Sequence, residues 1–306
     1  LKRLLAWTQT SSLADMLLAF VQRHPPSTPP HLDPRLSATE LQWDWLTDNG
    51  IVESVPADKA KDLQVISVGF KVLKSDMKSS RFVWDGGDFD KLVKAMLLEA
   101  RQSSSSSSST ASSSSDSSSV PSSAPASSEP TAPPPPLLPK MPTISIRDVA
   151  RRVLSGWKRI STNDYKSFFF QIPIHPSLRN FMGMACRAQN RQSLRFFRMK
   201  VLPMGISFAP STAQHLAEYT AQLLRHQHPN IQFDIILWID NVILLTNSAE
   251  DDMLLRKSYD DILARLGIVA KAWEVDTSLE ALGLDINLEQ QVIKPSTKSL
   301  EKIDAA

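Results

Sequence analysis

The chain has one cysteine, Cys186, among 306 residues. A single thiol excludes a disulfide within the chain and fits a reducing compartment, so we expect an intracellular protein of the nucleus or cytoplasm. No apolar run approaches the roughly 20 residues that a membrane-spanning helix needs, so we expect no membrane partner. The chain begins at Leu1 rather than methionine and carries an acid by position 15, unlike a signal peptide. We therefore expect an internal part of a longer open reading frame.

Apolar side chains are nearly missing from residues 102–136, which hold 18 serines and 7 prolines. Such a segment cannot bury enough surface to offset the entropy lost on ordering. We therefore expect a disordered Ser/Pro-rich insert at residues 102–138. Elsewhere helical and strand patterns alternate around a central hairpin, which predicts a mixed α+β fold with a partly antiparallel sheet.

The net charge of +2 conceals an uneven distribution. Residues 147–200 carry twelve Lys or Arg against only Asp148 and Asp164, a local charge of +10 that leaves about −8 for the remainder. Aromatic residues are interleaved with these cations, a combination that suits a phosphate backbone and stacked bases. The alternative is a solvated surface balanced by acidic regions elsewhere.

The most informative motif of the sequence is the tetrapeptide Trp238-Ile239-Asp240-Asn241. Runs of branched and aromatic residues at 231–237 and 242–246 flank it without Gly or Pro, which predicts a hairpin. A carboxylate at the tip of such a hairpin is well placed to bind a metal. The alternative is an ordinary Asp-Asn turn, because both residues tolerate turn conformations.

The surrounding sequence predicts further elements. Residues 159–174 and 268–274 are expected to be strands, and residues 210–226 a helix. A second helix should begin after Ser248 and end at Gly267, where a left-handed cap is wanted.

A second acid, Asp164, lies in the first of these strands. Two strand-borne carboxylates beside a basic and aromatic surface predict a two-metal site, since carboxylates are the ligands that hard divalent cations prefer. Two such ions clamp the attacking and leaving oxygens of a phosphoryl transfer.

The order of the short motifs resembles the fingers and palm of a reverse transcriptase. Asp164 with Phe169 five residues on resembles the first palm motif, and residues 238–241 stand where that family carries aromatic-x-Asp-Asp. Residues 202–210, Leu-Pro-Met-Gly-Ile-Ser-Phe-Ala-Pro, resemble the second motif, and residues 282–284, Leu-Gly-Leu, the primer-grip hairpin. The amino-acid sequences of these motifs are most similar to those of retroelements with a tyrosine recombinase, the DIRS and VIPER-like group. Each motif alone is weak, but several in the right order are strong.

The resemblance covers roughly residues 37–100 and 140–304, with the thumb largely absent. Together with the composition of the segments outside it, the resemblance predicts five segments: an N-terminal helix and Pro-rich linker (1–36), fingers (37–101), the disordered Ser/Pro insert (102–138), fingers and palm with the catalytic motifs (139–280), and the primer-grip hairpin with the start of the thumb (281–306).

The resemblance also implies roles for individual residues. Asp164 and Asp240 would hold two Mg²⁺ or Mn²⁺ ions, with the Tyr165 carbonyl as a further ligand and Asn241 at the position of the family's second acid. The nucleotide site would use Lys74 and Arg81 on the triphosphate, Phe169 beneath the sugar, and Met204 with Gly205 at the templating pair. Phe168 or Phe170 could take the place of Phe169. Trp238, Leu282 and Gly283 would contact the primer and template.

These roles predict an RNA-directed DNA polymerase that adds deoxynucleotides to a primer on an RNA or DNA template, as part of a retrotransposon polyprotein. RNase H and recombinase domains of the same polyprotein are possible partners. Asn241 departs from the family pattern because it offers a neutral oxygen where a carboxylate is usual. The alternative is therefore an inactive nucleic-acid-binding remnant. Lys271 is a candidate proton donor to pyrophosphate, although its spacing does not assign it.

Overall fold

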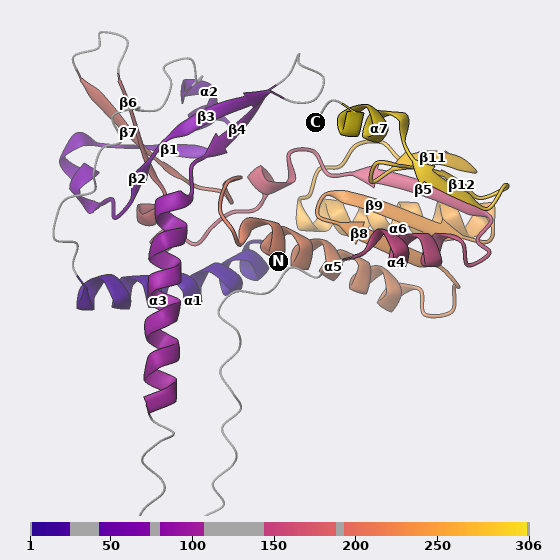
Figure 1. Ribbon diagram of the computed structural model, residues 1–306, viewed down its shortest axis with the longest axis horizontal. Coiled ribbons are helices and arrows are strands. Elements are labelled where there is room, and N and C mark those ends of the chain that lie inside the picture. Colours follow the sequence, from indigo (N-terminus) through magenta and orange to yellow (C-terminus); the bar gives the residue numbers. More distant parts are fainter. Residues whose placement is uncertain (1, 25–42, 74–79, 107–143, 188–192, 305–306) are drawn as a thin grey trace, which may run out of the picture.

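The computed structural model describes residues 2–24, 43–73, 80–106, 144–187 and 193–304. Over these residues the protein is a mixed α+β structure whose strands form four sheets, which confirms the predicted class. Figure 1 shows two groups of strands set apart along the long axis of the molecule, with helices running below both.

The first group contains a four-stranded sheet and a separate hairpin. The sheet has the order β1-β7-β6-β2 and is antiparallel except where β2 pairs with β6. The hairpin pairs β3 with β4. The strands are β1 Val52–Val55, β2 Ile66–Ser67, β3 Gly69–Leu73, β4 Ser80–Trp84, β6 Gly183–Arg187 and β7 Leu194–Met199.

The second group is organised around a central antiparallel sheet of order β10-β5-β9-β8. Strands β8 (Asp234–Trp238) and β9 (Asn241–Thr246) form the predicted hairpin, and β9 also pairs with β5 (Arg159–Asp164). Strand β10 (Glu274–Asp276) completes the other edge. Residues from distant parts of the chain therefore meet side by side in this sheet.

Both faces of the central sheet are buried, which explains the unbroken apolar runs of its strands. Val242 and Leu244 join the larger core with helices α5 and α6, while Ile243 and Leu245 join a second core with α4 and β12. Successive strand residues point to opposite faces, so each run supplies both cores. The bounds are α4 Ile146–Val153, α5 Ala209–Gln227, α6 Ala249–Leu266 and β12 Leu284–Asn287.

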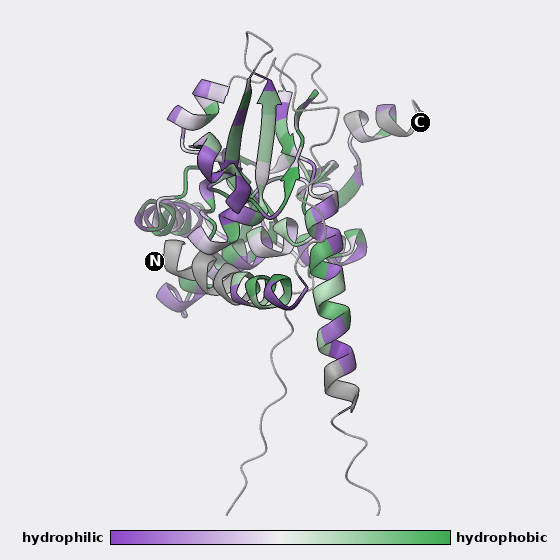
Figure 2. Ribbon diagram, turned by 90° about the vertical axis from the view of Figure 1, so that its left-hand side faces the viewer, coloured by the Kyte–Doolittle hydropathy of each residue, from purple (hydrophilic) through white to green (hydrophobic). Residues whose placement is uncertain are grey.

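The remaining elements surround these sheets. A three-stranded sheet of order β11-β12-β13 lies against the second core. In Figure 2, the coloured part of helix α3 carries alternating bands of hydrophilic and hydrophobic residues. No helix within the described ranges is long and apolar enough to span a membrane. The bounds are α1 Lys2–Arg23, α2 Trp43–Asp48, α3 Gly87–Ser106, α7 Thr297–Asp304, β11 Ser278–Ala281, β13 Val292–Pro295, and the 3-10 helices η1 Ala57–Asp62, η2 Phe168–Gln171 and η3 Pro176–Phe181.

Helix α1 is part of the larger core, although the motif resemblance begins after it. Leu13, Leu17 and Phe20 are buried there, and α1 packs against α3, α5 and η3. At its end, Arg23 and His24 contact the Glu99 carboxylate of α3 at 3.0 Å and 2.7 Å. The predicted N-terminal helix, α1, therefore packs into the same core as the strands. The Pro-rich linker predicted to follow it lies outside the described residues.

The predicted helix limits around the hairpin are confirmed. The Ser248 hydroxyl accepts a hydrogen bond from the Asp251 amide at 3.0 Å, which caps the start of α6. Gly267 has φ 65° and closes the helix in the left-handed conformation. Helix α5 spans nearly the predicted residues.

Three predicted boundaries are corrected. The strand predicted over 159–174 ends at Asp164, because the chain turns through a left-handed Ser167 into η2 and buries Phe168. The strand predicted over 268–274 is replaced by a segment without regular secondary structure that makes one isolated bridge, Tyr165 to Ala270, and β10 begins only at Glu274. Helix α3 continues to Ser106 and so includes the first residues assigned to the Ser/Pro insert. Residues 107–138 of the insert lie outside the described residues.

We expect Leu17→Ala to destabilise the protein by about 2–5 kcal/mol, because it removes a fully buried side chain and leaves a cavity. Leu18→Ala is the matched control, since Leu18 is the neighbouring residue and is 37% exposed. It should change stability by no more than about 0.5 kcal/mol. Urea unfolding measures both, and equal losses would show that α1 does not pack as described.

Candidate active site

The hairpin of β8 and β9 ends in a two-residue turn, Ile239-Asp240. Trp238 pairs with Asn241 across it, and Ile239 has φ 56°. A two-residue hairpin turn requires positive φ, and glycine usually supplies it. A β-branched residue in this conformation is strained, and strain of this kind persists only where neighbouring contacts enforce it. The turn is therefore a constrained support for Asp240.

Asp164 is brought beside this turn by the register of the sheet. It is the last residue of β5 and pairs with Asn241. The Tyr165 amide donates to the Asp240 carbonyl at 2.8 Å, which ties the end of β5 directly to the turn. Two acids 76 positions apart in the sequence thus share one end of the central sheet.

The two carboxylates influence each other. Burial and the nearby Asp164 charge raise the pKa of Asp240, while Arg81 and Lys271 oppose part of the shift. The Lys271 ammonium lies 3.2 Å from the Asp164 carboxylate. Since like charges held close together disfavour ionisation, a cation between the carboxylates would relieve this repulsion.

Asn241 contacts the catalytic candidate directly. Its amide nitrogen donates to the Asp240 carboxylate at 3.1 Å, so its amide oxygen is directed away from that contact. The position that resembles the family's second acid therefore supplies a hydrogen-bond donor to Asp240. This contact satisfies one carboxylate oxygen without adding negative charge.

The oxygens of Asp164 and Asp240 fit a divalent metal of the Mg²⁺ class, which takes one or two carboxylates and completes its shell with water and substrate phosphates. Within the described ranges, no group of three or more His, Cys, Asp or Glu side chains could hold a metal. The pair therefore suits an ion that arrives with phosphates rather than one enclosed by protein ligands.

Two cavities adjoin the site. One of about 140 Å³ is lined by Asp164, Asn241 and Lys271 among others. The other, of about 300 Å³, is largely apolar and lies between α4, Trp238 and Leu282. Leu282 and Gly283 form the turn between β11 and β12, both with positive φ. The structure therefore places the predicted primer residues Trp238 and Leu282 around one pocket beside Asn241.

The residues predicted to bind the nucleotide lie in different parts of the chain. Lys74 lies outside the described residues. Arg81 lies on β4, and its positive charge lowers the pKa of Asp240. The Met204 carbonyl accepts from the Trp84 amide at 3.0 Å, which docks the loop that carries Met204 and Gly205 onto β4. Gly205 has φ 113°, and a Cβ there would lie 2.0 Å from the Trp84 carbonyl oxygen.

The three consecutive phenylalanines differ in their surroundings. Phe168 is buried against Tyr165, with ring centroids 4.6 Å apart, and so is not available to a sugar. Phe170 lies near Phe82, with centroids 6.3 Å apart. Phe169 is half-buried against the larger core, and its role beneath the sugar stays a prediction.

Tyr165 fixes the end of β5 from inside the core. Burial raises the pKa of its hydroxyl to about 12, and that hydroxyl contacts Tyr259 at 2.5 Å and Thr220 at 3.3 Å. These partners belong to α5 and α6, so the residue next to Asp164 is joined to both helices. No side-chain role in metal binding follows, and the predicted role of its carbonyl remains a prediction.

Sequence reasoning named one neighbour of the site without assigning it and missed another. Lys271, the candidate proton donor whose spacing left it unassigned, contacts the Asp164 carboxylate. Gln214 on α5 contacts the backbone of the Ile239 turn, and no motif indicated it. Its only sequence signal is a polar residue on the helical face that also carries buried Ala213 and Ala217.

The geometry defines a paired-carboxylate hairpin site of the kind that nucleotide-transferring enzymes use. Residues 72–289 match the family model "Reverse transcriptase (RNA-dependent DNA polymerase)". The chain belongs to the reverse transcriptase family, whose members generally use divalent metal ions.

Similar curated proteins are viral polyproteins. The chain is 27% identical over 164 residues to the genome polyprotein of Petunia vein clearing virus (49% of this chain, 7% of the polyprotein). It is 27% identical over 146 residues to the Gag-Pol polyprotein of Avian leukosis virus subgroup A (47% and 8%). For the Gag-Pro-Pol polyprotein of Squirrel monkey retrovirus the values are 28% over 135 residues (43% and 7%). The alignments thus span less than a tenth of the length of these relatives.

We expect Asp240→Asn to stabilise the metal-free protein at neutral pH. The raised pKa of Asp240 means that the folded state binds its proton more tightly than the unfolded chain, whose Asp pKa is about 4. In the natural chain, the stabilisation that comes from protonated Asp240 is complete below the pKa of the unfolded state. It is lost as pH rises through the pKa of the folded state. In urea unfolding with EDTA, the free energy of unfolding of the variant should exceed that of the natural chain at pH 7. This difference in free energy should close toward pH 4. Exposed Asp261→Asn is the control, and a gap independent of pH would contradict the prediction.

We expect Gly205→Ala to cost more stability than Gly156→Ala. Both glycines have positive φ, so both substitutions incur backbone strain of about 1–2 kcal/mol. Only Gly205 also faces a carbonyl, whereas nothing lies within 4 Å of a Cβ at Gly156. The overpacked variant should lose about 1–3 kcal/mol more in chemical unfolding. Equal losses would mean that the loop is not docked on β4.

Proposed function

We propose that this chain is an RNA-directed DNA polymerase that extends a primer 3′ end with deoxynucleotides. The observation that carries the proposal is the meeting of Asp164 and Asp240 at one end of the central sheet, with the Tyr165 amide bonded to the Asp240 carbonyl at 2.8 Å. In this proposal the β1-β7-β6-β2 sheet and the β3–β4 hairpin are the fingers, the central sheet is the palm, and the thumb is largely absent.

Asp164 and Asp240 would hold two divalent ions, Mg²⁺ or Mn²⁺, with the Tyr165 carbonyl as a further ligand. Bound there, these ions would lower the pKa of the primer hydroxyl and stabilise charge on the triphosphate. The primer 3′-hydroxyl gives its proton to solvent and its oxygen forms a bond to the α-phosphorus. The bond from the α-phosphorus to the oxygen shared with the β-phosphate breaks, and pyrophosphate leaves. The rigid β5–β9 pairing keeps both carboxylates in place during this step.

The substrate would be bound by both groups of strands. Arg81, and in the proposal Lys74, would neutralise the triphosphate from the β3–β4 hairpin. Phe169 would exclude a 2′-hydroxyl, and Met204 with Gly205 would lie at the templating pair. Template and primer, RNA or DNA, would follow the basic residues of 147–200.

The primer end would lie near the apolar pocket beside Asn241. Trp238 and Leu282 line this pocket, and Gly283 forms the adjoining turn. An apolar wall supports a sugar or base without competing for its hydrogen bonds.

We further propose that the chain is part of a retrotransposon polyprotein of the tyrosine-recombinase group. Support comes from the amino-acid sequences of residues 164–176 and 202–210, which resemble those of that group. RNase H and recombinase domains of the same polyprotein would then be its partners.

A second candidate function, an inactive nucleic-acid-binding remnant, is favoured by Asn241 and Lys271. Asn241 adds no charge, and Lys271 places a cation 3.2 Å from the Asp164 carboxylate. Both lower the negative charge available to divalent ions.

We expect weak primer extension by the natural chain and none by Asp164→Ala or Asp240→Ala. Asn241→Asp restores a carboxylate and removes an amide donor from Asp240. It should lower the metal concentration for half-maximal extension by roughly tenfold. This is the lower end of the effect on metal affinity that substitutions next to metal ligands have. The measurement is extension of a primer on an RNA template with dNTPs, across Mg²⁺ and Mn²⁺ titrations.

The matched control for this experiment is Asn247→Asp. Asn247 is exposed and follows the other end of β9, roughly 20 Å from Asn241 at strand spacing, so it should leave the metal dependence unchanged. If no variant extends the primer while RNA still binds, the polymerase proposal fails for this chain and the remnant stands.

A further inference from the structure

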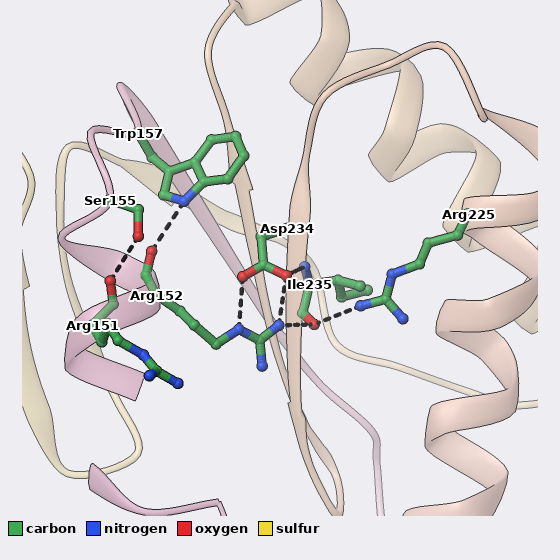
Figure 3. Close-up of polar contacts among 7 residues, drawn as sticks. All are labelled: Arg151, Arg152, Ser155, Trp157, Arg225, Asp234 and Ile235. Carbon is green, nitrogen blue, oxygen red and sulfur yellow. Dashed lines mark hydrogen bonds and ion pairs between the residues drawn. The ribbon is translucent and has the colours of Figure 1, made fainter. Parts of the chain in front are cut away.

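Strand β8 lies at the edge of the central sheet, and side chains from two helices occupy its open side. Figure 3 shows that Arg152 of α4 binds the start of β8. Its guanidinium donates to both carboxylate oxygens of Asp234, at 2.7 Å and 2.5 Å, and to the Ile235 carbonyl at 2.9 Å. Arg225 of α5 reaches the same carbonyl at 3.4 Å. An unpaired strand edge is thereby satisfied by protein groups.

Gln214 of α5 continues this arrangement to the other end of the strand. Its amide nitrogen donates to the Leu237 carbonyl at 3.2 Å, and its amide oxygen accepts from the Ile239 amide at 2.7 Å. The nitrogen also donates to the Glu218 carboxylate at 3.1 Å. Because each end of the amide faces groups of the opposite kind, its orientation is fixed. Gln214 is 1% exposed, so water cannot replace these bonds easily.

The Ile239 amide that Gln214 holds belongs to the strained residue of the turn. Ile239 has φ 56°, and Asp240 follows it directly. Backbone in this region persists where surrounding contacts specify it. The Gln214 contact specifies the amide on one side of Ile239, and the Tyr165 amide holds the Asp240 carbonyl on the other.

We propose that Gln214 is a positioning residue that sets the direction of the Asp240 carboxylate by fixing the Ile239 turn. It touches no reacting group and acts through the backbone. The functional consequence rests on the proposed polymerase activity, whereas the effect on the turn does not.

The arginine contacts do not explain this function. Arg152 and Arg225 act on Asp234 and Ile235, at the end of β8 remote from the turn. They close the strand edge there, and Gln214 alone among these three side chains reaches the residue before Asp240. Loss of Gln214 should therefore release the turn while the rest of β8 stays paired with β9.

The test compares Gln214→Leu with the natural chain. Leucine has a similar volume and can make neither hydrogen bond, so amide hydrogen exchange at Ile239 should accelerate by roughly tenfold. Mn²⁺ binding to the metal-free chain should weaken by roughly tenfold, as for other residues that orient metal ligands. In primer extension, kcat should fall while the KM for dNTP stays within about twofold, because Gln214 does not contact the nucleotide in the proposed arrangement.

Gln222→Leu is the matched control. Gln222 lies on the same helix two turns further along and lines the same pocket beside β8, but it makes none of these contacts with the turn. It should leave Ile239 exchange and Mn²⁺ affinity unchanged. Gln214→Glu keeps an acceptor for the Ile239 amide but sets a carboxylate against Glu218, so it should recover protection only when it is combined with Glu218→Gln. If the leucine variant does not fold, Gln214→Asn provides the same test, since its amide is one methylene shorter.

Unchanged Ile239 exchange and Mn²⁺ affinity in a folded Gln214 variant would overturn the inference. Faster exchange at Ile239 with unchanged Mn²⁺ affinity would also overturn it, because the turn would then not direct Asp240. If the natural chain binds no Mn²⁺ and Asn241→Asp does not restore binding, the metal-dependent function fails instead. The Ile239 exchange would still decide whether Gln214 holds the turn.

Discussion

The pairing of β5 with β9 is the contact on which the site depends. Its register sets Asp164 opposite Asn241 and so brings the end of β5 to the turn that carries Asp240. A shift by one residue would exchange the two faces of a strand. That shift is disfavoured because each face is already filled: Leu244 belongs to one core and Leu245 to the other. The packing of hydrophobic side chains thus determines where the two carboxylates meet.

The site itself is unfavourable for folding and is stabilised by its surroundings. Burial and Asp164 raise the pKa of Asp240, and Ile239 occupies a conformation that usually needs glycine. Neighbouring groups compensate: Lys271 pairs with Asp164, and Gln214 binds the turn. Local strain and like charge are features that native structures keep at functional sites. These two supporting contacts come from different parts of the chain, Gln214 from α5 and Lys271 from the segment after α6.

Family membership and chemistry are separate conclusions here. The family match covers residues 72–289, and a fold shared with reverse transcriptases does not by itself establish the activity of one chain. The local chemistry centres on Asn241, whose amide binds the Asp240 carboxylate where the family pattern has an acid. In our proposal, the formal charge missing at this position is the feature that distinguishes a metal-dependent polymerase from a protein that only binds nucleic acid.

The sequence by itself determined the features that depend on neighbouring residues: the hairpin around Asp240, the capped helix from Ser248 to Gly267, and the α+β class. It also singled out Asp164, because the motif that contains it is short and local. Only the tertiary structure decided that β5 ends at Asp164, that α1 joins the core, that Lys271 contacts Asp164, and that Gln214 contacts the Ile239 turn. An apolar run such as residues 168–172 is compatible with a strand or a short helix. The choice depends on burial and hydrogen-bond partners supplied from distant positions, which no local pattern contains.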